Sequence, residues 1–213
     1  DRAILKFNGK TPFEAANTPN LDYMAKNGVQ GVISLINEDI SPESDSGTMS
    51  LLSYDPLKYY TGRGPLEGLG VDFIDMDNDN SVSFRMQFAS YNEKTRRLDR
   101  RTAVGLSNEE LQLLTNELRQ KIKLNKFNDV NFKIMSYRQH RGIISFSSNT
   151  KKFSGNISDT DPGIKKIGAF GIPQFNYIPS PLECYALEST DEGNFTASVV
   201  NAFIAESKAV LTE

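Results

Sequence analysis

Alternation of apolar and polar residues between positions 82 and 88 constrains the fold of this chain more than any other feature. This period of two is typical of a strand with one buried face. A polar turn at 92–95 is expected to join it to a second strand. Because such strands must bury their apolar face against another layer, we expect an α+β unit. The alternating apolar residues are Val82, Phe84, Met86 and Phe88, and further strands are predicted at 97–101, 130–135, 142–146 and 153–157.

Two helices are predicted from their capping residues and apolar stripes. Ser107 and Glu110 have the spacing of a capping box, and the apolar stripe that follows is expected to be core. Thr190-Asp191 can cap the second helix, which we expect to pack against the N-terminal region or to act as a hinge. Residues 163–181, with three prolines, are expected to form a connection. The stripes are Leu111, Leu114, Leu118 and Ile122 in the first helix, and Phe195, Val199, Phe203 and Val210 in the second.

The N-terminal region has the pattern of an α/β structure. Thr18-Pro19 predicts the start of a helix that stops at Gly28. Residues 29–35 are rich in branched side chains and predict a buried strand. A short helix at 48–52 would place Ser44 near its N-terminus, and one helical turn is expected at 65–69. We therefore divide the chain into a first α/β segment at 1–75, an α+β domain at 76–180, and a connection with a returning helix at 181–213.

Composition excludes several classes of protein. The chain has 27 acidic and 24 basic residues and a net charge of −3, which argues against a general nucleic-acid binder. A single cysteine, Cys184, cannot form an internal disulfide and is expected to pack as a small apolar group, so a reducing cytoplasm is the simplest compartment. No apolar run approaches the length of a membrane span. One histidine, His140, excludes a multi-histidine metal site made by this chain alone.

Ser44 places a hydroxyl beside the carboxylate of Asp45, near the predicted start of a helix. A serine hydroxyl is a weak nucleophile unless a base or a metal ion stabilises its alkoxide. A helix N-terminus favours a bound phosphoryl group. The alternative is that both residues only cap the helix. Whether Asp45 orients Ser44 or caps the helix stays open.

Arginines are the second group of candidate site residues. Arg63 lies between two glycines, where the backbone can approach a ligand and the guanidinium can bind phosphate or carboxylate. It can equally pair with Glu67 to hold a turn. The other charged candidates can converge on an anion or form a solvated face, and His140 can contact a ligand or be an ordinary loop residue. These other candidates are Arg85, Asp99, Arg100, Arg141, Asp159 and Asp161.

Several short runs, in order along the chain, carry a resemblance to a known family. They are Gly9-Lys10-Thr11-Pro12, Thr18-Pro19-Asn20-Leu21-Asp22, Ser44-Asp45-Ser46, Tyr54-Asp55-Pro56, the run from Tyr60 to Glu67, Phe84-Arg85, Leu98-Asp99-Arg100-Arg101, Arg141-Gly142 and Ser158-Asp159-Thr160-Asp161-Pro162. With these runs the chain resembles the archaeal-type, cofactor-independent phosphoglycerate mutases of the alkaline-phosphatase superfamily. It departs from the family pattern at Thr48, where a histidine is usual, and at 103–106, where a Gly-Arg is expected.

The resemblance implies an alkaline-phosphatase-like α/β core segment with an inserted smaller α+β domain that binds substrate. It implies that Ser44 takes up the phosphoryl group and ligates a metal ion. Two divalent ions are implied, with Mn²⁺ expected and Mg²⁺, Co²⁺ or Zn²⁺ as alternatives, and no 2,3-bisphosphoglycerate. Substrate contacts are expected from Asp45, Arg63 and the six charged residues named above. The chain is expected to be the first part of a larger enzyme, without its first strand and its C-terminal metal-binding half.

The function implied is interconversion of 3- and 2-phosphoglycerate, as in glycolysis and gluconeogenesis, through a phosphoserine. An isolated fragment is expected to be inactive. Expected partners are phosphoglycerate and the remainder of the same enzyme, with no nucleic acid and no membrane, and an oligomer is compatible with the sequence. Two alternatives remain. One is another phosphatase or phosphopentomutase of the superfamily, and the other is a non-catalytic module that binds phosphorylated ligands.

Overall fold

The computed structural model describes residues 2–74, 78, 80–100, 102–138 and 140–212. The chain divides into two compact units, Asp1–Leu35 and Ile36–Glu213. Arg101, in one of the family-like runs, lies outside the described residues. The described residues form a mixed α/β structure with small sheets. The assignment to an alkaline-phosphatase-like core with an inserted domain, and the division at 75/76 and 180/181, stay predictions.

The first unit consists of short helices. They are η1 (Leu5–Phe7), α1 (Pro12–Ala15) and α2 (Pro19–Asn27). A capping box between Thr11 and Glu14 starts α1, and α2 begins and ends where the sequence predicts. The buried strand predicted at 29–35 was wrong, since this segment has no regular structure and Val29 and Val32 are fully exposed. A buried strand needs a hydrogen-bonded neighbouring strand, and residues 29–34 belong to none of the described sheets.

The second unit opens with three helices that position the candidate nucleophile. They are α3 (Ser44–Leu51), α4 (Pro56–Tyr59) and α5 (Arg63–Gly70). Helix α3 confirms that Ser44 lies at a helix start. Asp55 caps α4 by accepting a hydrogen bond from the backbone N–H of Leu57 at 2.9 Å, which gives the Tyr-Asp-Pro run a structural role. Helix α5 is longer than the single turn expected.

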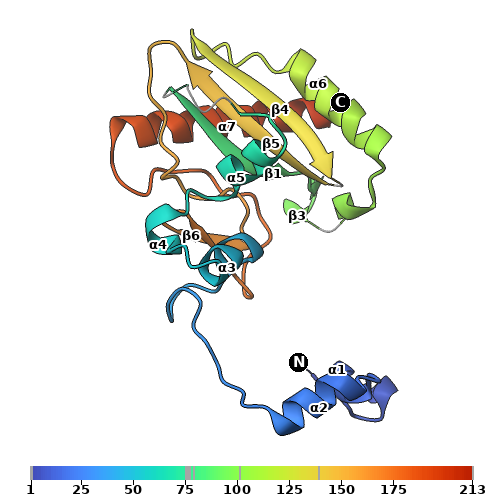
Figure 1. The fold of residues 1–213 in the computed structure, drawn as a ribbon. Helices are drawn as coiled ribbons and strands as arrows, with labels where there is room; N and C mark the ends of the chain where they lie inside the picture. The colour runs from blue at the N-terminus through green and yellow to red at the C-terminus, as the bar shows by residue number, and fades with distance from the viewer. Residues whose placement is uncertain (1, 75–77, 79, 101, 139, 213) are drawn as a thin grey trace. The chain divides into compact units, whose positions relative to one another are not determined.

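A three-stranded antiparallel sheet forms the centre of this unit (Figure 1). Its strands are β1 (Ser81–Gln87), β5 (Arg141–Ser148) and β4 (Val130–Arg138), in that order across the sheet. Phe84 of β1 lies opposite Ile144 of β5, on the apolar face, whereas Gln87 lies opposite Arg141. Because side chains alternate between faces, Arg85 and Gln87 of β1 lie on the opposite face from Phe84.

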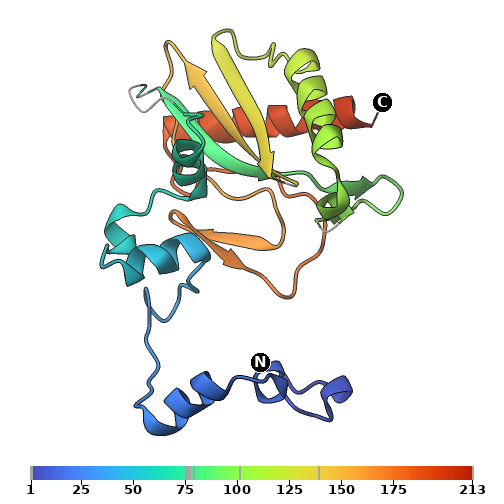
Figure 2. The same cartoon turned by 45° about the vertical axis from the view of Figure 1, so that its right-hand side comes forward.

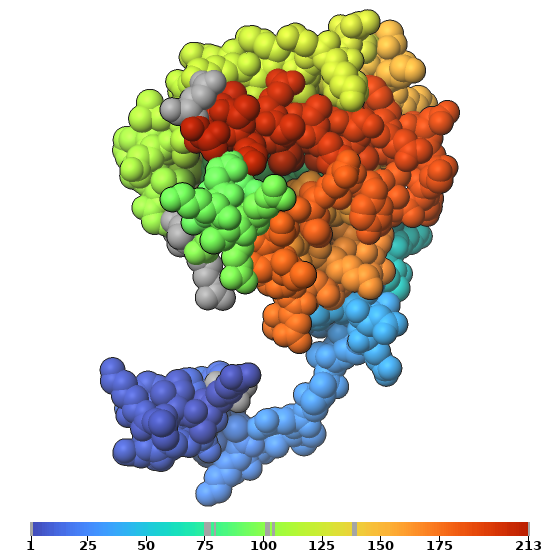
Figure 3. Space-filling model, turned by 180° about the vertical axis from the view of Figure 1, so that it is seen from behind, coloured from blue at the N-terminus to red at the C-terminus, as the bar shows by residue number. Residues whose placement is uncertain are grey.

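Two helices cover the apolar face of the sheet. They are α6 (Asn108–Lys121), with its predicted capping box, and α7 (Asp191–Leu211). The ring of Phe203 in α7 packs edge-on against Phe132 and Phe146, with centroids 5.3 and 5.7 Å away. Figure 3, seen from behind, shows α7 lying across this side with α6 beside it. The apolar stripe of α7 completes the core of the sheet, and the expectation that this helix returns to the N-terminal segment or acts as a hinge stays a prediction.

Helix α5 packs on the other face of the sheet, in front of it in Figure 1. The contact depends on Gly64, where a Cβ atom would lie 2.2 Å from the backbone oxygen of Ser83. No side chain fits at that distance. The glycine of the Gly-Arg-Gly run thus brings the start of α5, and Arg63 with it, directly onto β1.

Two hairpins complete the second unit. Strands β2 (Ser90–Asn92) and β3 (Arg97–Asp99) confirm the predicted turn at 92–95, and the 3-10 turn η2 (Thr102–Gly105) follows. Strands β6 (Ile164–Ile167) and β7 (Phe170–Pro173) form a hairpin in the segment expected to be a plain connection. Figure 2 shows this hairpin near α3, and the ring of Phe170 lies 5.0 Å from that of Tyr60. The strand predicted at 153–157 was wrong, since only the single bridge Ile157–Ala186 forms there.

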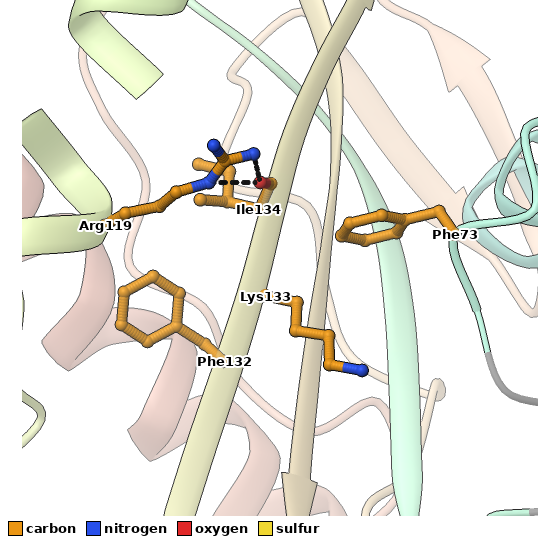
Figure 4. A pocket seen from close by; sticks show the side chains of 5 residues that line it. All are labelled: Phe73, Arg119, Phe132, Lys133 and Ile134. Atoms are coloured by element: carbon orange, nitrogen blue, oxygen red, sulfur yellow. Dashed lines mark hydrogen bonds between the residues drawn. The ribbon is translucent and has the colours of Figure 1, made fainter. Parts of the chain in front are cut away.

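The free edge of β4 is covered by side chains of α6. Arg119 donates from Nε and Nη2 to the backbone oxygen of Ile134, at 3.0 and 2.6 Å (Figure 4). This contact forms one wall of a shallow hollow of about 320 Å³ that Phe73, Phe132 and Lys133 also line. The hollow lies on β4, at the sheet edge, and its guanidinium is occupied in shielding that edge from pairing with another chain. None of the described helices is long and apolar enough to cross a membrane.

Candidate functional site

Ser44 is the first residue of α3, and its hydroxyl is exposed. Glu43 precedes it as the N-cap, with its backbone N–H donating to Ser46 Oγ at 3.2 Å. This capping arrangement is made by Glu43 and Ser46. The hydroxyl of Ser44 therefore remains available for other contacts.

Arg63 links the starts of α3 and α5. Its Nη2 donates to Ser44 Oγ at 2.9 Å, and its Nε donates to Asp45 Oδ2 at 3.1 Å. The same Nη2 lies 3.0 Å from a carboxylate oxygen of Glu43. Gly62, with φ of 96°, lets the chain enter α5 at the angle that points this guanidinium toward α3. Pairing with Glu67, the alternative weighed from the sequence, is also present at 3.9 Å.

Asp45 holds Arg63 in place. Its Oδ2 also accepts a hydrogen bond from the Tyr60 hydroxyl at 2.6 Å, and its Oδ1 accepts one from the backbone N–H of Ser46 at 2.8 Å. Burial by itself would raise the pKa of Asp45, but these hydrogen bonds and the charge of Arg63 outweigh it and lower the pKa. Asp45 is therefore ionised at neutral pH, and it orients the guanidinium that contacts Ser44.

A cavity of about 460 Å³ adjoins this cluster. Arginines from three parts of the unit converge on it: Arg85 from β1, Arg141 from β5 and Arg100 from the segment after β3. Arg63 and Glu43 reach the same cavity and connect it to Ser44. The residues that line it are Glu43, Arg63, Arg85, Gln87, Leu98, Asp99, Arg100, His140, Arg141, Ile164 and Tyr177.

The arginines of this cavity differ in how far they are already paired. Nε of Arg85 and Nε of Arg141 are buried and have no hydrogen-bond partner among the described residues. Arg100 instead pairs with Asp161, with Nε 3.0 Å from Oδ2. Burial, followed by the charge of Arg63, lowers the pKa of Arg85 despite the opposing charge of Glu67. Nε of Arg85 also lies 3.8 Å from a carboxylate oxygen of Glu67. Buried donors without hydrogen-bond partners are costly, and an anion is the kind of ligand that such donors suit.

Asp159 and Asp161 form a hydrogen-bonded turn next to the cavity, and Asp161 pairs with Arg100 of the cavity wall. Asp159 accepts a hydrogen bond from the backbone N–H of Asp161, and Asp161 accepts one from Gly163, both at 2.8 Å. Gln87 also donates to Asp161 at 3.2 Å. Burial raises the pKa of Asp159. Neither aspartate is among the residues that line the cavity, so direct substrate contact by either one stays a prediction, whereas Asp99 lies on the cavity wall.

Sequence reasoning named Glu67 only as a possible partner of Arg63 and did not single out Tyr137. The Glu67 carboxylate lies between two arginines, with Arg63 Nη1 at 3.9 Å and Arg85 Nε at 3.8 Å. The Tyr137 hydroxyl on β4 donates to the same carboxylate. Burial and the bond to Glu67 raise the pKa of Tyr137 to about 12. The four-residue spacing of Arg63 and Glu67 is a usable signal for one contact, but no local pattern points to Tyr137.

The implied metal ions can be tested against the donors present. Among the described residues there is no group of three or more His, Cys, Asp or Glu side chains arranged to hold a metal ion. Ser44, Glu43 and Asp45 cluster together, but their oxygens are engaged by Arg63, whose positive charge opposes a cation there. The donor set of the residues that the structure describes does not fit a two-metal centre.

Known proteins resemble this chain over most of its length. Residues 25–213 match the family model described as 2,3-bisphosphoglycerate-independent phosphoglycerate mutase. A protein with that name from Methanobrevibacter smithii is 32% identical, over 100% of this chain and 47% of its own length. The corresponding protein of Saccharolobus solfataricus is 36% identical, over 94% of this chain and 44% of its own length. The chain thus spans about half the length of the curated relatives it matches.

A solved structure agrees with the sequence comparison. The cofactor-independent phosphoglycerate mutase from Thermoplasma acidophilum is 29% identical with a TM-score of 0.53, and the match covers 100% of this chain and 50% of that one. Sequence and fold therefore lead to the same group of proteins. The chain belongs to the 2,3-bisphosphoglycerate-independent phosphoglycerate mutase family.

Proposed function

We propose that this chain supplies the nucleophile and the anion-binding arginines for the interconversion of 3- and 2-phosphoglycerate. The observation that carries the proposal is the contact of Arg63 with Ser44 Oγ at the mouth of an arginine-lined cavity. Phosphoglycerate carries a phosphate and a carboxylate, so it needs several cations at once. The relatives named above are called phosphoglycerate mutases independent of 2,3-bisphosphoglycerate, and we propose the same for this chain.

The transfer is a two-step exchange of one phosphoryl group. Ser44 Oγ forms a bond to phosphorus while the bond from phosphorus to the glycerate oxygen breaks. The proton leaving the serine hydroxyl balances the one taken up by the glycerate oxygen. After the glycerate turns, its other hydroxyl attacks the phosphoserine and Ser44 regains its proton. Arg63 donates to Ser44 Oγ and favours negative charge on that atom and on the oxygens of the arriving phosphoryl group.

The arginines of the cavity are proposed to have different roles in substrate binding. Arg85 and Arg141 each have a buried Nε that makes no hydrogen bond to the described residues, and they are proposed as the direct anion contacts. Glu67 pairs with Arg85 and Asp161 with Arg100. Two divalent ions, with Mn²⁺ expected and Mg²⁺, Co²⁺ or Zn²⁺ as alternatives, belong to the proposal, and their ligands have to come largely from residues not described here. A metal contact of Ser44 stays a prediction that requires Arg63 to release the serine hydroxyl. The cytoplasmic location, the contact with the remainder of a larger enzyme and an oligomeric state stay predictions.

Turnover measured on the intact enzyme tests the proposal. The enzyme is given 3-phosphoglycerate, and both 2-phosphoglycerate and free inorganic phosphate are followed over time. Formation of 2-phosphoglycerate without 2,3-bisphosphoglycerate is the expected result. Release of inorganic phosphate alone would replace the mutase with a phosphatase. Binding without any turnover would favour a non-catalytic phospho-ligand module.

A further inference from the structure

His140 occupies a position in the arginine cavity that the proposed transfer does not use. It lies in the turn between β4 and β5, directly before Arg141. Its backbone oxygen accepts a hydrogen bond from the N–H of Phe88 at 2.9 Å, which ties the turn to the end of β1. The side chain is partly buried and lines the cavity together with Arg85, Arg100 and Arg141.

The imidazole of His140 has an unmet hydrogen-bonding capacity. Its Nδ1 is buried and has no hydrogen-bond partner among the described residues, as is also true of Nε of Arg85 and of Arg141. Three unpaired polar atoms thus belong to three residues that line one cavity. Polar atoms buried without a partner are uncommon in folded proteins and call for a ligand or water. Nε of Arg85 also lies 3.8 Å from a carboxylate oxygen of Glu67, so Nδ1 of His140 and Nε of Arg141 are the two atoms of this set for which no partner is described.

We propose that His140 is a further anion-binding residue of this cavity, and that it takes up a proton when a dianion such as a phosphate group binds. The inference rests on the proposed function, because it places the phosphate or carboxylate of that substrate against His140. Protonation turns Nδ1 and Nε2 both into donors, so the charged imidazole can add a charge-assisted hydrogen bond to those of the arginines.

The charges around His140 explain why the proton arrives only with the anion. Burial lowers the pKa of His140, and the charges of Arg141, Arg85 and Arg100 lower it further. The imidazole is therefore neutral at neutral pH in the free protein. The charged or titratable side chains elsewhere on the cavity wall are Glu43, Arg63, Asp99 and Tyr177.

A bound dianion counteracts the effect of the arginines on the pKa of His140. Its two negative charges offset the arginines and raise the pKa of the imidazole. By linkage, protonation of His140 strengthens anion binding by the same factor by which the bound anion strengthens proton binding to the imidazole. The anion therefore binds more tightly as the pH falls. The effect is expected around the ordinary pKa of histidine, about 6.5, where ordinary carboxyl and phenol groups do not titrate.

Sulfate is a suitable first probe because it stays a dianion between about pH 5 and 8, the range in which histidine titrates. His140 is the one histidine of the chain, so its imidazole proton resonance is identified by its loss in His140→Gln. We expect saturating sulfate to raise the pKa of this imidazole by about one unit, which corresponds to about tenfold in affinity. Sulfate should bind the parent about tenfold more weakly at the upper end of the range, and this pH dependence should be lost in His140→Gln. The phosphate of 3-phosphoglycerate itself titrates at about pH 6, so its effect on the imidazole pKa is the readout used for that ligand.

Two outcomes separate this inference from the proposed function. If sulfate and 3-phosphoglycerate bind but leave the imidazole pKa unchanged, His140 has no part in binding, and the mutase proposal stands. If neither ligand binds at any pH, or if Arg141→Ala binds both as the parent does, the cavity is not an anion site and both proposals fail. The titration of the parent protein gives a result even if His140→Gln does not fold.

Discussion

Arg63 Nη2 donates a hydrogen bond to Ser44 Oγ at 2.9 Å, across 19 positions of the sequence. This contact ties the candidate nucleophile to the cavity that holds four arginines. It is possible because α3 and α5 both begin at this point, and because Gly64 lets α5 lie directly on the sheet. The predictions below each test one part of this arrangement.

Arg141→Ala should weaken the handling of phosphoglycerate by the intact enzyme. The Nε of Arg141 has no hydrogen-bond partner among the described residues and is offered to a ligand. A charge-assisted contact is worth roughly 1.5–3 kcal/mol, so kcat/KM should fall about ten- to a hundredfold. Steady-state kinetics measure this, with the exposed Lys126→Ala as the matched control. Metal content should be unchanged. Kinetics equal to those of the parent would show that Arg141 does not contact the substrate.

Glu67→Gln should raise KM for phosphoglycerate more than it lowers kcat. The carboxylate lies between Arg63 and Arg85, so neutralising it releases both guanidinium groups from their positions. We expect KM to rise about tenfold, the scale of one hydrogen bond to a charged group. Tyr137→Phe removes one bond to Glu67 but leaves its charge, and should have a smaller effect. If Glu67→Gln changed kcat as much as KM, or if Tyr137→Phe had the same effect as Glu67→Gln, a positioning role of the Glu67 charge would be contradicted.

Gly64→Ala should destabilise the fold, whereas Gly70→Ala in the same helix should not. A Cβ at Gly64 would meet the backbone oxygen of Ser83 at 2.2 Å, while a Cβ at Gly70 would meet nothing within 4 Å. Overpacking of this kind costs about 1–3 kcal/mol or more. Alanine at Gly70 should instead stabilise the helix by up to about 1 kcal/mol. Chemical denaturation of both variants gives the comparison, and equal stabilities would contradict the close contact of α5 with β1.

Asp45→Asn should reduce stability at neutral pH and make stability less sensitive to acid. The pKa of Asp45 is lowered, because hydrogen bonds from Tyr60 and Ser46 and the charge of Arg63 outweigh burial. Such a carboxyl contributes stability above its unfolded pKa of about 3.9, and that contribution is lost as the pH falls through its folded pKa. Denaturation curves from neutral pH to about pH 3 measure this, with Glu38→Gln as the exposed control. The Asp45→Asn and parent proteins should converge in stability at the acid end, and a constant difference would count against the ionised network.

Local patterns predicted much of the second unit. The alternation around Phe84 predicted β1, and the Ser107–Glu110 capping box predicted the start of α6. The hairpin of β6 and β7 was missed, because its short strands lie in a segment rich in glycine and proline. The strand expected at 29–35 did not form although its composition suits a buried strand, because residues 29–34 belong to none of the described sheets.

The candidate site was predictable only in part. Ser44 and Arg63 each stand in a short run that suggests anion chemistry, and the structure brings them into contact. The contact of Glu67 with Tyr137 spans 70 positions and depends on how α5 packs on the sheet, against β1 and β5, which no local spacing encodes. The different pairing of Arg85 and Arg100 likewise depends on their neighbours in three dimensions.

The central claim is that Ser44 accepts the phosphoryl group, and trapping of a phosphorylated enzyme tests it most directly. The intact enzyme is quenched during turnover of 3-phosphoglycerate, and phosphorylated peptides are identified by mass spectrometry, with Ser44→Ala and the exposed helix variant Ser198→Ala in parallel. The account predicts phosphate on Ser44 in the parent and in Ser198→Ala, and loss of both phosphate and mutase activity in Ser44→Ala with little loss of stability. Mutase activity of Ser44→Ala within a few-fold of the parent, or phosphate on another residue, would contradict it.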